Sequence, residues 1–250
     1  MNTLLTAFIA ALVVTTMANT CTTVYLHRAL SHRALSVHPS VAFVFRAVLW
    51  LTTGIKPKEW VAVHRKHHAY TDIEGDPHSP VLLGWKRVQL KNVALYREAL
   101  ADPELITKYA KDLPDDKWDR MFFGHNKTGL ALGIAILVVV FGPLTGLLAA
   151  FMHANIYLAG NAAVNAMGHH FGRRPYENNA TNLQWLAFCT MGEGLHNNHH
   201  AAPSSARLSH TRRQVDPGWW VIRLLSSLKL ATLRFDDIRL TASAKASTLK

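Results

Sequence analysis

The chain has 250 residues, of which 49% are hydrophobic and only 17% are charged. That balance is too apolar for an ordinary soluble enzyme, and we expect one membrane domain over residues 1–250. The formal net charge of +11 raises the question of nucleic acid. The aromatic residues lie mostly in apolar runs, however, so we expect no nucleic-acid partner. We interpret the positive charge as a means of attracting anionic lipid headgroups and acidic partner proteins.

Charged residues are absent from two stretches, residues 1–26 and 128–167. Because a membrane-crossing helix needs about 20 predominantly apolar residues, these stretches have room for one span and two spans. No basic segment precedes the first apolar run, which argues against a cleaved signal peptide. Gly142 and Pro143 supply a turn between the last two spans. We predict three transmembrane helices, over residues 4–26, 123–141 and 147–167.

The apolar segment at residues 41–55 is short for a span and carries Arg46. If it crossed, the histidine-rich stretches before and after it would lie on opposite faces of the membrane. We therefore predict an interfacial helix over 41–55, and a second one over 217–235 with tryptophans at the interface. The charged residues 86–127 are predicted to form a helical cap. The predicted fold class is an all-α integral membrane protein with about three transmembrane helices and a cytosolic cap holding a dimetal site.

Histidines gather in three short motifs. The first is the pair His27 and His32, five residues apart. The other two share the spacing H-x-x-H-H, which on a helix places all three rings on one face. Two predicted crossings separate the second motif from the third, so all three motifs lie on the same side of the membrane. The second and third motifs are His64, His67 and His68, and His196, His199 and His200.

The last predicted span carries polar residues, which are costly in a bilayer and indicate a functional site. Asn165 and His169 are four residues apart and share a face near the end that returns to the histidine motifs. The acidic residues at 70–80 have two interpretations. They are either hydrogen-bond partners of metal-binding histidines or part of a solvated turn.

With His169, the motifs contain nine histidines, more than one metal ion of ordinary coordination accepts. Two metals with four or five ligands each account for them, and imidazole suits iron, copper, nickel and zinc, so spacing does not select the metal. The two cysteines form no C-x-x-C motif, which argues against a zinc ribbon. A dimetal site at the mouth of a membrane bundle, without a Ser/His/Asp set or a phosphate loop, favours redox chemistry on a lipid-like substrate.

These motifs resemble those of the membrane-bound fatty acyl desaturases, specifically the delta-9-like group that acts on acyl-CoA or acyl-lipid at a mid-chain position. The resemblance runs from about residue 15 to about residue 225. The Asn-x-x-x-His and Gly-Glu-Gly-x-His contexts make it stronger than the histidine boxes alone. The matching segments are His27-Arg28-x-x-Ser31-His32, Glu59-Trp60, His64-x-x-His67-His68, Asp76-Pro77-His78, Gly84-Trp85, Asn165-x-x-x-His169, Phe171-Gly172-x-Arg174-Pro175-Tyr176 and Gly192-Glu193-Gly194-x-His196-Asn197-Asn198-His199-His200.

The resemblance implies a reaction in which dioxygen and two electrons remove two hydrogens from a fatty acyl chain and leave a cis double bond. It implies two iron ions bound by the nine histidines, with Asn165 contacting one metal through water and no separate acid–base residue. Trp60 either lines the substrate tunnel or serves packing. One iron would take His27, His32, His64, His68 and one histidine of the third motif, and the other would take His67, His169 and the remaining third-motif histidines.

The chain departs from the family pattern at two points. The family usually has two spans before the first motif, whereas this chain has room for one, and Leu195 stands where an aromatic residue is common. No haem-binding His-Pro-Gly-Gly motif occurs, so the resemblance implies a separate electron donor, a ferredoxin or cytochrome with its reductase. We expect the metal site on the cytoplasmic face of a bacterial inner membrane.

Other functions share some of these features. A di-iron membrane hydroxylase on a lipid would use the same oxidant and differ in its product, which gains an oxygen instead of losing two hydrogens. A desaturase acting on acyl chains bound to a carrier protein differs only in the head group. A zinc-dependent hydrolase or metal carrier would work without oxygen.

Overall fold

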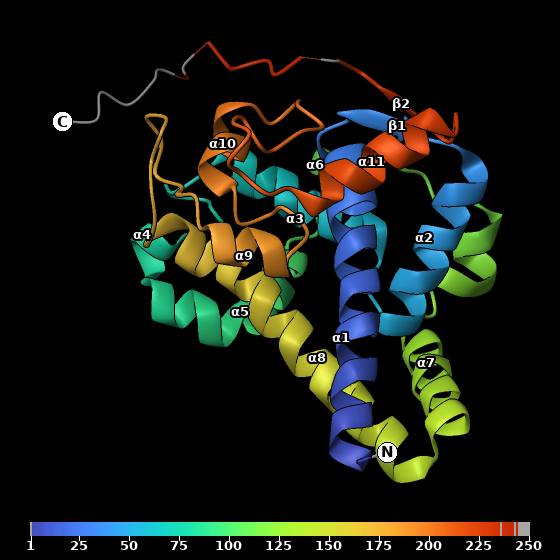
Figure 1. Ribbon diagram of the computed structural model, residues 1–250. Coiled ribbons are helices and arrows are strands. Elements are labelled where there is room, and N and C mark those ends of the chain that lie inside the picture. Colours follow the sequence, from blue (N-terminus) through green and yellow to red (C-terminus); the bar gives the residue numbers. More distant parts are fainter. Residues whose placement is uncertain (1, 236, 243, 245–250) are drawn as a thin grey trace.

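The computed structural model describes residues 2–235, 237–242 and 244, which are mostly helical (Figure 1). Two long helices organise them. Helix α1 (Thr3–Cys21) continues into the π-helical η1 (Thr22–Ser31), and α8 (Pro143–Ala166) continues into the 3-10 turn η3 (Met167–His169). Both combined helices, Thr3–Ser31 and Pro143–His169, are long and apolar enough to cross a membrane. They contain the spans predicted at residues 4–26 and 147–167.

The predicted span at 123–141 is a shorter helix, α7 (Asn126–Phe141), because residues before it form the π-helical turn η2 (Asp119–Phe123). Its 16 residues extend about 24 Å, less than the roughly 30 Å hydrocarbon core of a bilayer. The chain then reverses at Gly142, whose φ of 83° lies in the region that glycine tolerates best, and Pro143 begins α8.

Helix α7 packs closely on α2 (Pro39–Thr52), which is the short helix predicted at 41–55. Two glycines four residues apart make this approach possible. A Cβ atom at Gly129 would meet the Trp50 carbonyl oxygen at 2.5 Å, and one at Gly133 would overlap the Leu51 carbonyl oxygen. Small residues at this spacing let helix backbones come together in membranes.

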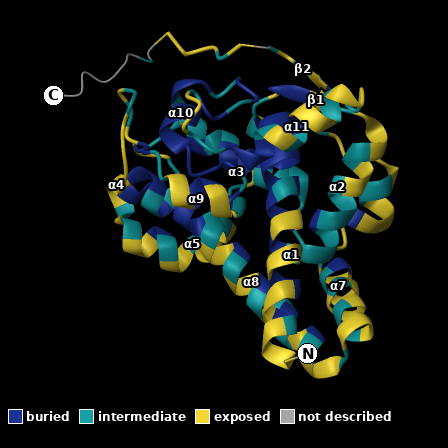
Figure 2. Cartoon of the chain, viewed as in Figure 1, coloured by how far each residue is buried: buried dark blue, intermediate teal, exposed yellow. Residues whose placement is uncertain are grey.

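The N-terminal halves of α1 and α8, together with α7, form a stalk at the bottom of the view (Figures 1 and 2). The side chains that the stalk exposes are mainly apolar, as expected for contact with hydrocarbon. Its exposed side chains include Leu4, Phe8, Leu12, Val139, Leu144 and Phe151.

Above the stalk lies a body of shorter helices, and most of the buried residues are found there (Figure 2). Its largest apolar cluster joins η1 to α2 and to the C-terminal helix through Leu26, Leu49 and Ile222. The predicted cap at 86–127 contains two of the body helices, α5 and α6. The body helices are α3 (Pro57–Ala69), α4 (Pro80–Leu83), α5 (Trp85–Leu100), α6 (Leu105–Tyr109), α9 (Gln184–Cys189), α10 (His196–Ala201) and α11 (Pro217–Ser227).

The surface helix predicted over 217–235 is too long by eight residues. Helix α11 ends at Ser227, Lys229 takes a φ of 58°, and the chain continues as strand β2 (Ala231–Leu233). This strand pairs antiparallel with β1 (Leu35–Val37), which lies far away in the sequence. Residues that the local amphipathic pattern assigned to the helix are therefore in a strand.

Candidate metal centre

The first histidine pair is brought together by an unusual helix. Residues five apart diverge on an α-helix, but η1 is π-helical, with bonds that span five residues. The His32 N–H donates to the His27 carbonyl at 3.1 Å, and the Ser31 hydroxyl donates to the Leu26 carbonyl at 2.8 Å. This winding places the two imidazole centroids 4.9 Å apart.

The third motif is held in place by the two asparagines between its histidines. The fully buried side chain of Asn198 donates to the Leu208 carbonyl at 2.8 Å, and that of Asn197 donates to the Ala180 carbonyl at 3.0 Å. These bonds fix α10 against the loops on either side of it. The histidines of the motif therefore face inward, toward α3 and the end of α8.

The nine predicted histidine ligands lie in two groups. Five converge in the first, where facing Nε2 atoms are 2.8 Å apart for His32 and His64 and 3.1 Å apart for His27 and His199. The first group is His27, His32, His64, His68 and His199, and the second is His67, His169, His196 and His200. This division coincides with the one that the family resemblance implies.

The two groups are adjacent. His67 and His68 are neighbours on α3 but belong to different groups, and the His68 ring stacks on that of His200 at 4.6 Å between centroids. Within each group, one nitrogen from every ring lies within 4.8 Å of all the others. Two centres therefore lie side by side, between α3 and α10.

The donor set fits metal ions in both groups. Two ligand nitrogens that each lie about 2.1 Å from a metal ion, with a right angle at the metal, are about 3.0 Å from each other. The facing histidine Nε2 atoms are 2.8–3.2 Å apart. The buried Nε2 atoms of His67 and His169 have no hydrogen-bond partner among the described residues. An orphaned buried nitrogen is costly unless a ligand satisfies it.

Carboxylates hold three of the histidines from behind. Asp76 lies 3.0 Å from His67 Nδ1, Asp72 lies 2.8 Å from His169 Nδ1, and Glu193 lies 2.7 Å from His27 Nδ1. A carboxylate at Nδ1 places the proton there and leaves Nε2 free to bind metal. Of the two interpretations of the acids at 70–80, the structure favours hydrogen bonding to the histidines.

The electrostatics of these groups agree with that arrangement. Burial raises the pKa of Asp72, but the hydrogen bonds from His169 and Ser79 outweigh it, and the pKa is lowered. Burial lowers the pKa of His64 and of His68 well below the usual value, and neighbouring histidines lower it further. The carboxylates are thus ionised and these imidazoles neutral at physiological pH, which are the protonation states that metal binding requires.

Asn165 and Trp60 line a small cavity of about 90 Å³ beside the histidines. His64 of the first group and His196 of the second also face this cavity, so Asn165 lies beside both centres. The Trp60 indole stacks on the His64 ring with 4.9 Å between centroids and 11° between planes. Trp60 therefore packs against His64 and also forms part of the cavity wall.

Sequence reasoning gave no role to Glu193, Arg28 or Asp216. Arg28 and Asp216 form a fully buried ion pair at 2.8 Å, and Arg28 lies 4.0 Å from Glu193. Glu193 and Arg28 do occur in the segments that carry the family resemblance, which is the available signal for them. Asp216 has no local signal, because its partner is 188 residues away.

Two further buried histidines, His78 and His153, lie outside the nine. His153 is buried in α8 and bonds to the Thr15 hydroxyl and the Thr52 carbonyl, both at 2.9 Å. The buried ring of His78 stacks on that of His67 at 4.6 Å, close to the second group.

The fold and the site together define a membrane-associated helical protein with a histidine-rich, metal-competent centre. A sequence profile described as fatty acid desaturase matches residues 2–221. The chain therefore belongs to the fatty acid desaturase family, as the motifs indicated. This assignment makes it an oxidoreductase with a fatty acyl substrate.

Individual relatives agree with the family. The chain is 31% identical over 234 residues to the Delta-9 desaturase-like 2 protein of Arabidopsis thaliana, covering 90% of this chain and 76% of the relative. It is 31% identical over 218 residues to the sn-1 stearoyl-lipid 9-desaturase of Synechocystis sp., covering 84% and 65%. It is 32% identical over 213 residues to the sn-2 palmitoyl-lipid 9-desaturase of Nostoc sp., covering 82% and 73%.

Proposed function

We propose that this protein catalyses oxygen-dependent desaturation of a long-chain acyl group, inserting a cis double bond at a mid-chain position. The observation that carries the proposal is the convergence of nine histidines into two adjacent groups of five and four. Relatives named as 9-desaturases of stearoyl-lipid and palmitoyl-lipid support the substrate class and the position.

Iron is the metal proposed for both groups. Two bound irons would supply an oxidant, made from dioxygen and two electrons, that is strong enough for an unactivated C–H bond. His27, His32, His64, His68 and His199 would hold one ion, and His67, His169, His196 and His200 the other. Asn165 would hold a water beside one of them.

The surrounding residues contribute orientation and exclusion of water. Asp72, Asp76 and Glu193 keep the Nδ1 protons in place and fix the rings to which they are bonded. Burial of both groups keeps bulk water from the oxidant. Trp60 forms the wall along which the acyl chain passes His64.

The stalk would lie in the bilayer, with the metal centre on the cytoplasmic side of a bacterial inner membrane. An external ferredoxin or cytochrome, with its reductase, would deliver electrons. The net charge of +11 would favour an acidic donor, because charge complementarity accelerates the encounter.

The test is the fatty-acid profile of cells that express this chain together with a ferredoxin and its reductase. We expect a new monoene, with its double bond located by mass spectrometry, that is absent from cells with His67→Ala. The matched control is His125→Ala, an exposed histidine outside both groups, which should retain the product. A hydroxylated product would replace the desaturase with a hydroxylase, and no new product from the intact chain would refute both.

A further inference from the structure

Five arginines gather on two loops beside the third histidine motif and have no role in the account above. Residues 170–182 carry two of them and one carboxylate, Glu177, whereas residues 203–215 carry three and no carboxylate. Within the part of the chain that the structure describes, none of the five forms an ion pair. All except Arg207 are exposed, and together we call them the arginine surface: Arg173, Arg174, Arg207, Arg212 and Arg213.

The two loops are joined to each other and lie away from the stalk. The Tyr176 hydroxyl and His210 Nδ1 are 2.9 Å apart, and the two rings pack edge-on at 5.3 Å between centroids. Helix α10, against which both loops are held, lies near the top of the body, whereas the stalk is at the bottom (Figure 1). A soluble protein can therefore approach this surface while the stalk lies in a bilayer.

The composition of the surface suits an acidic protein. Five cations beside one carboxylate attract an anionic partner and accelerate its encounter. Guanidinium groups are weakly hydrated and make bidentate bonds to carboxylates. Phe171, at the edge of the surface, is exposed and packs edge-on against Trp85 at 5.2 Å between centroids. Arginines beside exposed aromatic rings are typical of the residues that dominate binding at protein interfaces.

The first loop is joined by hydrogen bonds to the second histidine group. The Tyr176 N–H donates to the Asn197 side-chain oxygen, and the Asn197 amide donates back to the Tyr176 carbonyl, both at 2.9 Å. Asn197 directly follows His196 in the chain. In addition, the Arg174 guanidinium donates to the His169 backbone carbonyl at 3.3 Å.

The second loop is joined in the same way to the first histidine group. The Gln214 side-chain oxygen accepts from the His210 N–H at 2.7 Å and from the Asn198 amide at 2.9 Å. Asn198 directly precedes His199. Because electrons tunnel more readily through covalent and hydrogen bonds than across gaps between atoms, the arginine surface is well connected to both groups.

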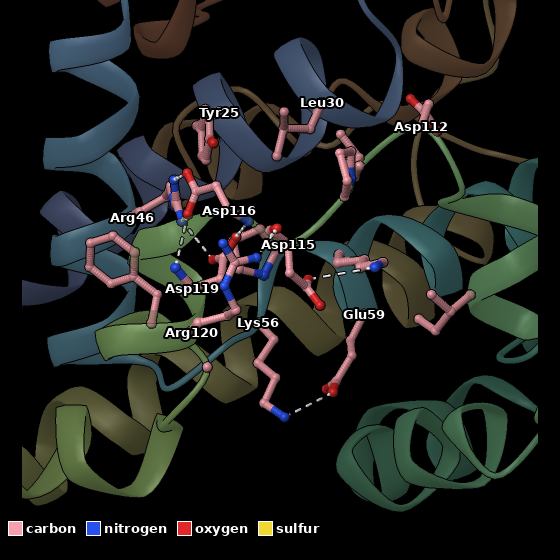
Figure 3. Close-up of a pocket in the computed structure, with 17 residues that line it drawn as sticks. Tyr25, Leu30, Arg46, Lys56, Glu59, Asp112, Asp115, Asp116, Asp119 and Arg120 are labelled. Carbon is pink, nitrogen blue, oxygen red and sulfur yellow. Dashed lines mark hydrogen bonds and ion pairs between the residues drawn. The ribbon is translucent and has the colours of Figure 1, made fainter.

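A different charged region of the body is a poorer site for an acidic protein. It is a cavity of about 510 Å³ between η1, the start of α3, the loop that follows α6, and η2 (Figure 3). Carboxylates there outnumber cations, and Arg46 is already bound by Asp116 at 2.7 Å and by Asp119 at 2.6 Å. The cations are Arg46, Lys56, Lys58 and Arg120, and the carboxylates are Glu59, Asp112, Asp115, Asp116 and Asp119.

We propose that the arginine surface is the docking site of the electron donor, an acidic one-electron carrier protein. This inference rests on the proposed desaturase function and names the place where its partner binds. Each double bond consumes dioxygen, two electrons and two protons and releases two waters that also contain the two hydrogens removed from the acyl chain. Two reduced carriers therefore dock in succession, and each leaves oxidised by one electron.

Docking can be measured without the acyl substrate. The probe is an acidic [2Fe–2S] ferredoxin, and the intact, metal-loaded chain is held in nanodiscs of phosphatidylcholine. Calorimetry measures binding of oxidised ferredoxin, and anaerobic stopped-flow absorbance measures reoxidation of reduced ferredoxin. The variant is Arg212→Glu with Arg213→Glu, two exposed residues outside both histidine groups. We expect its second-order rate at low salt to fall about tenfold or more, and the difference to shrink at high salt because ions screen exposed charges.

A matched pair controls for net charge. Arg97→Glu with Lys111→Glu makes the same charge change at exposed residues outside the two loops, and its rate should change less than about twofold. Both double variants should keep the metal content and unfolding temperature of the intact chain. An equal loss of rate in the two double variants, or no loss in Arg212→Glu with Arg213→Glu, would overturn the docking site.

Anionic lipid is the other partner that could occupy these arginines. Native mass spectrometry of phosphatidylglycerol retention separates the two partners. If Arg212→Glu with Arg213→Glu loses the lipid and keeps the ferredoxin rate, the arginines face headgroups and the docking site is refuted.

Turnover separates this proposal from the one on which it rests. With an acyl substrate and dioxygen supplied, equal double-bond formation at low salt by the intact chain and by Arg212→Glu with Arg213→Glu retains the desaturase and overturns the docking site. Ferredoxin binding and reoxidation that depend on these arginines, without a double bond on any acyl substrate, overturn the desaturase function alone.

Discussion

Glu193 lies 2.7 Å from Nδ1 of His27, on a segment 166 positions later in the chain, and it is buried against Arg28. Burial raises the pKa of this carboxyl group, but its contacts with His27 and Arg28 outweigh that effect and the pKa is lowered. Glu193 is therefore an anion behind a histidine of the first group, and it increases the electron density that His27 offers to a metal.

Replacing Glu193 with Gln would test this relationship. The amide keeps the shape of the side chain and removes its charge, so we expect metal affinity at the first group to fall by about 10- to 100-fold. Metal content after dialysis against a weak chelator measures the effect. Glu177→Gln, at an exposed residue, is the control, and an unchanged metal content in Glu193→Gln would contradict the role.

The division of the histidines into two groups predicts metal stoichiometry. His32→Ala should lose the ion of the first group and His169→Ala that of the second, because each change removes one ligand from a different set. We expect each variant to retain about one metal per chain and the double variant to retain none. Loss of both ions from either single variant would show that the groups do not bind independently.

The H-x-x-H-H spacing is local, so the sequence alone singled out the six histidines of the second and third motifs, which the structure brings together with His27, His32 and His169. The sequence left the role of the acids at 70–80 open, because Asp72 reaches His169 across 97 positions, and it gave no role to Glu193. It also missed the π-helical winding that unites His27 with His32, since no residue pattern distinguishes η1 from a continued α-helix. The prediction that the last helix reaches residue 235 was wrong for a similar reason, because residues 231–233 pair with β1, which is distant in the sequence.

His210 provides a pH-dependent contribution to stability outside the metal centre. Burial, with the nearby charge of Arg207, lowers its pKa to about 4, from about 6.5 in an unfolded chain. Between these values the unfolded chain binds the proton and the folded one does not, so folded stability falls as the pH decreases from 6.5 to 4. His210→Gln should reduce this fall. Thermal unfolding of both proteins across that range measures it, and identical slopes would exclude His210 as a source.

The contact between α7 and α2 predicts a strong effect of side-chain size at Gly133. A Cβ atom there would overlap the Leu51 carbonyl oxygen, so Gly133→Ile forces the two helices apart and should cost about 1–3 kcal/mol. We expect a lower unfolding temperature in detergent and a smaller membrane-integrated fraction. The control is Ile134→Val at the next position, where 40% of the residue surface is exposed. If Gly133→Ile unfolds at the same temperature as this control, the close helix contact does not stabilise the fold.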